Sequence, residues 1–309
     1  MVMNAAKAQL SPNEKKLKGR AIRRKGVGLT VIFLFLILLY VPVAVLVVYS
    51  FTPATNIGTW TGFSFQLYRD LFHDKEIMVA LGNTAILAVS SSLISVILGT
   101  CGAIGTFYSG KRNRRFIEMM TQIPVVNAEI VIALSLTVLF VFAGSYLFGG
   151  ANIFSFWTLL IGHIILSLPF VYLSVKPKLQ QMDPALYEAA LDLGCTQRGA
   201  LRKVLLPAIW PGVLSGLLLA ITLSLDDFIV TAFTRGAGLL SGEKTIDTLS
   251  TLVQAKIKKG PVPPAMRALT TLIVLFVFLL VVLITVYQSR QEKRSKHRKG
   301  REVASHEER

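Results

Sequence analysis

The chain has 309 residues and a net charge of +16; 53% of its residues are hydrophobic and its mean hydropathy is +0.59. This composition excludes a soluble domain with a polar surface. The basic residues lie beside apolar runs, so membrane topology and anionic lipid headgroups explain them more simply than nucleic-acid binding. The two cysteines, Cys101 and Cys195, fall in different predicted environments and support neither a disulfide nor a metal site.

Six apolar runs predict an all-α integral membrane protein. About 20 helical residues cross a hydrocarbon core of about 30 Å, and helices are required there because lipid offers the backbone no hydrogen-bond partner. The first run is longer than the core of a signal peptide and no small-x-small cleavage site follows Phe51, so we interpret it as a retained anchor. The runs cover residues 27–51, 84–108, 119–143, 156–175, 212–234 and 267–287.

The distribution of charge predicts the topology. Of the 33 Lys and Arg residues, 25 lie in residues 1–26, 109–118, 176–211 and 288–309. Because cytoplasmic loops of membrane proteins carry an excess of Lys and Arg, both termini and the 176–211 loop are predicted to be cytoplasmic. Residues 27–287 then form a single transmembrane domain, with the basic stretches 1–26 and 288–309 as cytoplasmic tails.

The loop between the first two runs, residues 52–83, is predicted to lie on the outside and carries a group of aromatic residues. Such side chains suit anchoring at the membrane interface and packing, and a docking surface for an external partner is the alternative. The group consists of Trp60, Phe63, Phe65 and Tyr68.

Three carboxylates lie in otherwise apolar runs: Glu129 in the third, and Asp226 with Asp227 in the fifth. An ionised side chain near the bilayer centre costs about 2.5–3.5 kcal/mol, so such residues usually face a cavity or a partner group. We take all three as candidates for a cation-attracting substrate pathway; a helix–helix contact, or an interfacial pair that reaches water, is the alternative. Adjacent helical residues point about 100° apart, so only one of the two aspartates can face a central pathway squarely.

Two further features of the apolar runs bear on a site. Glu129 follows Pro124 and Asn127, so the third run is a candidate for a broken helix, and broken helices often line transport cavities. His163, in the fourth run, has no His, Cys, Asp or Glu at a metal-ligand spacing, and we predict that it is a hydrogen-bonded packing residue. No cofactor and no metal is expected for this chain.

The 176–211 loop is predicted to form two short helices. Asp183 is a good N-cap, and Gly194 suits the left-handed turn that ends such a helix. Thr196 can cap a second helix, which Pro207 is predicted to end. The hairpin either packs beneath its own bundle or docks into a partner's groove through a small apolar ridge. The 3.6-residue period places on that ridge Leu186, Ala189, Ala190 and Leu193.

Fixed spacings within this loop identify it further. Glu188-Ala189-Ala190, Gly194 and Leu206-Pro207 match the pattern EAA-x3-G-x9-I-x-L-P, with Val204 in place of the usual Ile. The loop therefore resembles the EAA loop of bacterial ABC-importer permeases. This resemblance implies a type I ABC-importer permease fold in a bacterial inner membrane, with these six motif residues coupling the permease to an ATPase.

Further stretches resemble the spermidine/putrescine-type ABC permeases, in particular the second of their two membrane subunits. These stretches are Asn83-Thr84 and residues 124–136, 223–228 and 260–270. The resemblance implies a complex with a homologous permease, two ATP-binding cassette ATPases and an external substrate-binding protein. It also implies that ATP closes the ATPase dimer, that the coupling loop moves with it, and that the three intramembrane carboxylates help to carry a polycation.

The sequence contains no motif for nucleotide binding or catalysis. A P-loop requires G-x4-G-K-[ST], and the nearest text, GEKT at residues 242–245, inserts Glu between Gly and Lys. A nucleophile elbow and a zinc signature are also missing from the sequence. The chain is therefore predicted not to be an enzyme, and ATP is expected to bind to its partner subunits.

The loop over residues 235–267 argues against a polyamine. It carries six Lys or Arg residues against Glu243 and Asp247, and a net charge of +4 beside the entrance would repel a polycation. An ABC permease for another small solute, such as an organophosphonate, iron or a sugar derivative, is therefore an alternative. A secondary transporter is a more remote one, because it predicts internal inverted repeats and leaves the EAA loop unexplained.

Overall fold

The computed structural model describes residues 12–54, 58–236, 246–259, 263–279, 281–282 and 285–286. Within these ranges the chain is all-α, as predicted, and forms no strand. Five helical segments in the described part are long and apolar enough to cross a membrane. They are Gly28–Tyr49, Lys75–Tyr108, Glu129–Tyr146, Phe156–Gln181 and Gln197–Asp226.

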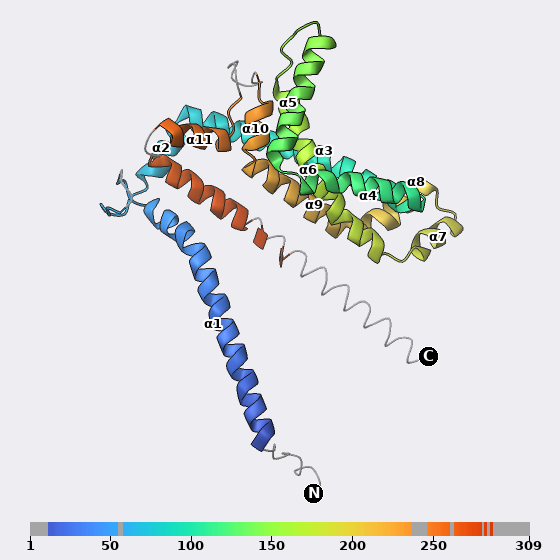
Figure 1. The fold of residues 1–309 in the computed structure, drawn as a ribbon, viewed down its shortest axis with the longest axis horizontal. Coiled ribbons are helices and arrows are strands. Elements are labelled where there is room, and N and C mark those ends of the chain that lie inside the picture. Colours follow the sequence, from blue (N-terminus) through green and yellow to red (C-terminus); the bar gives the residue numbers. More distant parts are fainter. Residues whose placement is uncertain are drawn as a thin grey trace.

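A π-helical turn, Leu201–Leu205, joins α8 to α9. A shorter apolar helix, Ala265–Leu279, follows α11 and covers the first part of the predicted sixth run. The rest of that run is described only in part, and residues 288–309 lie outside the described residues. The elements labelled in Figure 1 are α1 (Pro12–Tyr49), α2 (Gln66–His73), α3 (Lys75–Tyr108), α4 (Lys111–Val126), α5 (Glu129–Tyr146), α6 (Phe156–Gln181), α7 (Ala185–Asp192), α8 (Gln197–Ala200), α9 (Leu206–Asp226), α10 (Ile229–Thr234) and α11 (Leu249–Lys259).

Three helices, α3, α6 and α9, pack along one another and form the core of the bundle (Figure 1). Val171 of α6 lies between them with no exposed surface. A Cβ atom on Gly99 of α3 would lie 2.8 Å from the Val171 side chain, and one on Gly216 of α9 would lie 3.2 Å from the Val171 Cα atom. Glycine at these two positions lets the helices approach closely enough for dense packing, which is a main source of helix association in lipid.

The first helix, α1, extends away from this core. In Figure 1 its C-terminal end lies near α2, and the rest of the helix diverges from α3, α6 and α9 toward the N-terminus. None of its most apolar window is buried within the chain, and Phe33 and Leu38 are 64% and 75% exposed. An apolar surface of this size requires lipid or another polypeptide to cover it.

Two of the predicted runs are broken helices. The third run divides into α4 and α5, because Asn127 and Ala128 have extended backbone with ψ angles of 145° and 136°. The break lies three residues after Pro124, where the sequence predicted it. The fifth run divides into α9 and α10 at Asp227, whose ψ angle is 124°. This second break was not predicted, and no proline accompanies it.

The structure also corrects one boundary. Pro207 does not end the second helix of the predicted hairpin, because the chain stays helical from Gln197 to Asp226. The wider π-helical turn that precedes Pro207 accommodates its ring and its missing N–H group. At the N-terminus, α1 begins at Pro12, so the helix of the first apolar run continues into the basic stretch 1–26, and its apolar span begins at Gly28.

The packing around Val171 generates a prediction for stability. Gly99→Ala should lower the thermal stability of the purified protein, because overpacking a tight core costs about 1–3 kcal/mol. Gly102→Ala is the matched control, since a Cβ atom there has nothing within 4 Å in the same helix α3. Thermal unfolding in detergent measures both variants. Equal melting temperatures for the two would contradict the close approach of α3 to α6.

Candidate functional site

The two helix breaks lie close together and bring the three predicted carboxylates into one region. Helix α10 packs on α5, so the α9–α10 break lies beside the start of α5. Glu129, the first residue of α5, lies within electrostatic range of both Asp226 and Asp227. The side chains of Glu129 and Asp226 are exposed, whereas Asp227 is buried. The three residues therefore lie near one another, but two are exposed and one is buried.

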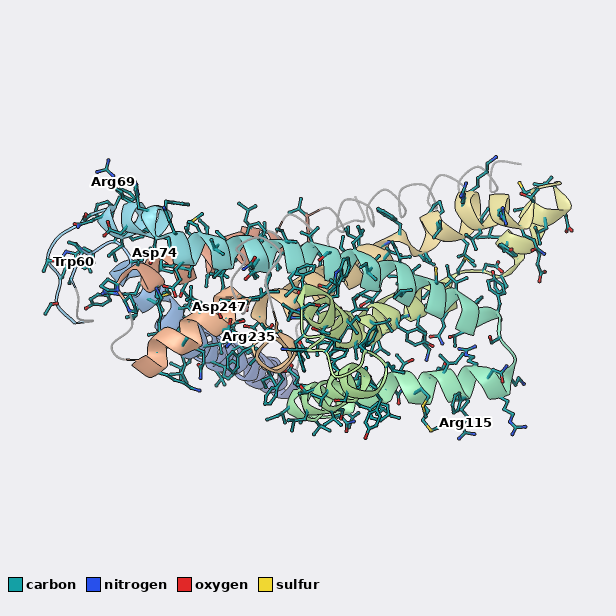
Figure 2. The ribbon with its side chains drawn as sticks, turned by 90° about the horizontal axis from the view of Figure 1, so that it is seen from above. Trp60, Arg69, Asp74, Arg115, Arg235 and Asp247 are labelled. Carbon is teal, nitrogen blue, oxygen red and sulfur yellow. The ribbon has the colours of Figure 1, made fainter. Side chains whose placement is uncertain are left out.

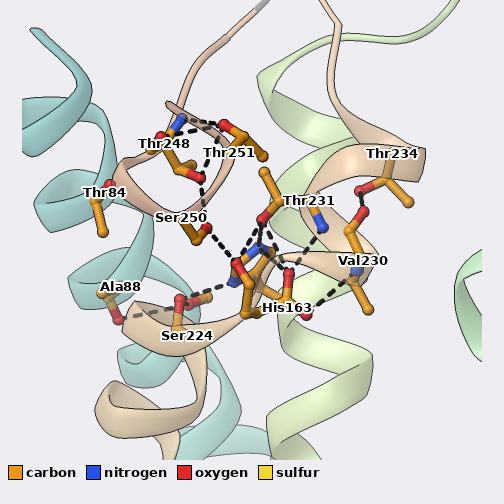
Figure 3. Close-up of polar contacts among 12 residues, drawn as sticks. Thr84, Ala88, His163, Ser224, Val230, Thr231, Thr234, Thr248, Ser250 and Thr251 are labelled. Atoms are coloured by element: carbon orange, nitrogen blue, oxygen red, sulfur yellow. Dashed lines mark hydrogen bonds and ion pairs between the residues drawn. The ribbon is translucent and has the colours of Figure 1, made fainter. Parts of the chain in front are cut away.

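Asp227 is buried and holds the start of α10, where Figure 3 shows Val230 and Thr231. Its Oδ1 accepts the Val230 N–H at 3.2 Å, and its Oδ2 accepts the Thr231 N–H at 2.8 Å and the Thr231 hydroxyl at 2.9 Å. Its main-chain carbonyl accepts the Ser250 hydroxyl of α11 at 2.6 Å. The side chain thus satisfies N–H groups that a helix leaves unpaired at its start, which explains how the fifth run breaks without a proline.

His163 of α6 supports the same break. It is 1% exposed, its Nδ1 lies 2.8 Å from the Ser224 hydroxyl and its Nε2 lies 2.9 Å from the Thr231 hydroxyl. Its Nε2 also lies 3.5 Å from Asp227 Oδ2. The sequence predicted a hydrogen-bonded packing residue, and the structure agrees. Its link to Asp227 was not predicted, because nothing in the sequence indicates which residues share a buried site.

Asp226 faces the opposite way and lines an open cavity of about 800 Å³. The cavity lies between α1, α9, α11 and the helix Ala265–Leu279. Its wall is mostly apolar, with Asp226 as its acidic group and Tyr40, Phe228 and Phe278 as its aromatic ones. The prediction that only one of the two aspartates can face a pathway is consistent with this arrangement. The structure selects Asp226 for the cavity and Asp227 for the interior.

Two cations of the 235–267 loop form ion pairs with carboxylates in the described part of the chain. Arg235 forms an ion pair with Asp247 (Figure 2). The ammonium group of Lys256 lies 2.9 Å from a carboxylate oxygen of Glu76 and 3.6 Å from one of Asp74. Two of these three carboxylates, Asp74 and Glu76, lie at the start of α3, which the charge count over residues 235–267 did not include.

The last cation of that loop is buried. Arg267 is 5% exposed, and its guanidinium donates to the backbone carbonyls of Tyr49 and Ala54. Lys258 is exposed, and residues 242–245 and the Lys259 side chain lie outside the described part. The net charge of +4 therefore overstates the positive field at this end of the bundle.

At the other end of the bundle, α7 and α8 form the predicted hairpin. Asp183 Oδ1 accepts the Ala185 N–H at 3.0 Å, and the Thr196 hydroxyl accepts the Gly199 N–H at 3.2 Å. Gly194 has a φ angle of +84°, the left-handed conformation that its position requires. Both caps and the turn thus follow the sequence-based expectation.

The hairpin exposes an apolar ridge. Leu186 and Leu193 are 55% and 86% exposed, and Glu188, Ala189, Gly194 and Pro207 are exposed beside them. Ala190, expected on this ridge, is instead buried, and Leu206 is half-buried. The reason is helical geometry, because Ala190 lies at the edge of the ridge next to Tyr187, which packs into the core cluster of α6 and α9.

Two contacts that the sequence did not predict stabilise this end of the bundle, the first between the hairpin and α3 and the second between α4 and α6. The rings of Tyr187 and Tyr108, at the end of α3, have centroids 5.5 Å apart. Glu118 of α4 accepts hydrogen bonds from Lys176 of α6 at 2.9 Å and from Arg114 at 3.0 Å. These bonds from Lys176 and Arg114 lower the pKa of the Glu118 carboxyl below its usual range.

Comparisons with known proteins agree with this arrangement of a broken-helix bundle and an exposed hairpin. Residues 91–297 match the family described as binding-protein-dependent transport system inner membrane component. The chain is 34% identical to the spermidine/putrescine transport system permease protein PotC of Escherichia coli (strain K12), over 71% of this chain and 78% of that protein. It is 32% identical to the putrescine transport system permease protein PotI of the same strain, over 72% and 76%.

Two solved structures share the fold. A bacterial ABC transporter involved in the import of the acidic polysaccharide alginate matches 89% of this chain and 98% of that one, with a TM-score of 0.68 and 19% identity. A bacterial alginate ABC transporter in complex with an alginate pentasaccharide-bound periplasmic protein matches 88% and 94%, with a TM-score of 0.64 and 19% identity.

The fold and the hairpin define a transport permease of the inner membrane. The chain belongs to the family of binding-protein-dependent transport system inner membrane components.

The Glu118 cluster generates a prediction for pH dependence. A carboxyl whose pKa is lowered by folding stabilises the protein above its unfolded pKa, and this contribution disappears as the pH falls through the lowered value. Glu118→Gln should therefore lower the melting temperature at neutral pH, by at most the equivalent of about 1 kcal/mol because the pair is partly exposed. Arg115→Gln, an exposed residue of the same helix, is the control. A difference from the wild type that persists unchanged in acid would contradict this assignment.

Proposed function

We propose that this chain is one of two membrane permeases of a bacterial ABC importer for polyamines, and that separate subunits bind and hydrolyse ATP. The observation that carries the proposal is the 34% identity to PotC across most of both chains. The exposed carboxylates Glu129 and Asp226, placed together at two helix breaks, support a polycationic cargo. The chain itself binds no cofactor in this proposal.

The charge distribution supports an orientation. The excess of Lys and Arg in residues 109–118 and 176–211 assigns the α7–α8 hairpin and both termini to the cytoplasm. The end that carries α2 and α11 then faces outward, where an external substrate-binding protein delivers cargo. The pairing of Lys256 with Asp74 and Glu76, which the charge count over the loop omitted, weakens the electrostatic objection to a cationic cargo at that entrance.

The exposed ridge of the hairpin supports a coupling role. Leu186, Ala189 and Leu193 present small and branched apolar side chains that have no partner within the chain's own bundle, and Glu188 lies beside them. We assign this ridge, with Gly194 as its turn, to the groove of an ATPase. When ATP closes the ATPase dimer, the hairpin moves with it and the bundle switches between two states as a rigid body.

The cavity beside Asp226 supports recognition of protonated amines. A carboxylate attracts an ammonium group, and the faces of Tyr40, Phe228 and Phe278 can hold a second one by cation–π interaction. The apolar remainder of the wall suits the methylene segments between the amines. Glu129 extends the acidic character of this region toward α5.

The uncovered surface of α1 supports a second membrane subunit. Tyr40 of α1 lines the cavity, and none of the most apolar window of α1 is buried within the chain. A homologous permease packed there would cover α1 and close the pathway around Asp226. Lipid would cover what remains.

Uptake tests the cargo. Cells that lack this chain should lose uptake of labelled spermidine and putrescine and regain it with the gene, in a strain without other polyamine importers. Asp226→Asn should lower uptake about tenfold or more, because a charged hydrogen bond contributes about 1.5–3 kcal/mol. Asp70→Asn, an exposed carboxylate of α2 outside the cavity, should transport normally. Unchanged uptake in the deletion strain would rule out a polyamine cargo.

Coupling is tested separately. Glu188→Ala should reduce transport and cargo-stimulated ATP hydrolysis while the permease still reaches the membrane, since Glu188 is exposed and supports no core contact. Gly194→Ala should act in the same way, because a left-handed conformation costs a non-glycine residue about 1–2 kcal/mol. Gln181→Ala, exposed at the end of α6, is the control. Normal coupling in both hairpin variants would exclude the docking role.

A further inference from the structure

The polar groups around the α9–α10 break form one ordered chain of hydrogen bonds (Figure 3). Ser91 of α3 donates to the Ser224 hydroxyl at 3.1 Å, which leaves Ser224 to donate to Nδ1 of His163. At the other end, Thr231 uses its proton on Asp227 Oδ2, so it accepts the Nε2 proton of His163. This pattern assigns a neutral imidazole with its proton on Nε2.

The chain joins elements that are distant in sequence. His163 lies on α6, Ser224 on α9, Thr231 on α10 and Ser91 on α3, and all four side chains are at most 3% exposed. Asp227 joins them through its carboxylate and is tied to α11 through its main-chain carbonyl. The residue after Asp226 is therefore fixed at both its side chain and its main chain.

Because the hydrogen bonds fix Asp227, they also determine the orientation of its neighbour Asp226. Asp226 is the last residue of α9, and the extended backbone at Asp227 turns the chain into α10. If the Asp227 carboxylate turned away from α10, the N–H groups of Val230 and Thr231 that it now accepts would be freed, and continuing α9 as a regular helix could satisfy them. Each further residue of a helix rotates by about 100°, so the carboxylates would be redistributed around the helix axis.

We propose that His163 is a positioning residue for transport. Through Thr231 and Asp227 it holds the α9–α10 break open, and the break directs the Asp226 carboxylate into the cavity. This inference rests on the proposed function insofar as Asp226 contacts cargo. The orientation of Asp226 itself does not depend on which cargo is carried.

A role in packing alone makes a different prediction. A residue that only fills space could be replaced by Leu with a loss of stability and no specific effect at residue 226. His163, in contrast, connects two hydroxyls across three helices, and Leu would leave Ser224 and Thr231 without those partners. Gln is neutral and carries one acceptor and one donor on a planar group, so it can restore both bonds.

The first experiment measures the orientation without any cargo. Asp226→Cys is introduced into the full-length chain with Cys101→Ser and Cys195→Ser, and its reaction rate with a membrane-impermeant cationic thiol reagent is recorded. We expect His163→Leu and Thr231→Val each to change this rate by about tenfold or more, and His163→Gln to restore it. Ser92→Ala, a buried serine of α3 whose hydroxyl donates to the Val89 carbonyl, is the control and should leave the rate unchanged.

Equal labelling rates in the wild-type and His163→Leu backgrounds would overturn the proposal. Thr231→Val preserves side-chain shape and removes only the bridging hydroxyl, so it decides the question if His163→Leu does not fold. A second readout is the uptake kinetics in the complete transporter. His163→Leu should change uptake in an otherwise normal chain and add no further loss to Asp226→Asn, because both act through the same carboxylate.

The cargo contact of Asp226 and the positioning role of His163 are tested by different outcomes. Normal uptake by Asp226→Asn would refute the assigned cargo contact while the labelling experiment still tests the positioning role. An additive loss in the double variant His163→Leu with Asp226→Asn would refute positioning through Asp226, whatever cargo is transported.

Discussion

Polar groups inside an apolar bundle must find their partners within the protein, and this constraint is most stringent where a helix is broken. At the α9–α10 break the Asp227 carboxylate accepts the N–H groups of Val230 and Thr231, and His163 completes the arrangement from α6. The break then allows α10 to pack on α5, which brings Glu129 near Asp226. The acidic region thus depends on one buried cap.

The core of α3, α6 and α9 connects this region to the hairpin at the other end. Helix α6 carries His163 in its first half and Lys176 in its second, and Tyr187 of the hairpin packs against the end of α3. Because Gly99 and Gly216 let the helices touch closely around Val171, displacement of the hairpin is transmitted through packed side chains rather than absorbed by voids. Such a core suits the rigid-body switching that we propose.

Among the sequence features, the charge of residues 235–267 was the most misleading. Counted along residues 235–267, the cations form a positive entrance; in three dimensions Arg235 and Lys256 meet carboxylates, and Arg267 is buried against backbone carbonyls. The partners of Lys256 lie at the start of α3, far away along the chain. A charge count over one loop cannot include them, because ion pairing depends on which loops the fold brings together.

The sequence by itself determined the features that depend on local spacing. Apolar runs, the caps Asp183 and Thr196, the turn at Gly194 and the break after Pro124 each depend on residues within a few positions of one another. Only the tertiary structure decided that Asp226 faces the cavity and Asp227 the interior, that the fifth run breaks, and that Ala190 packs inward. These outcomes depend on side chains contributed by other helices, such as His163, and a one-dimensional pattern does not indicate which of them meet.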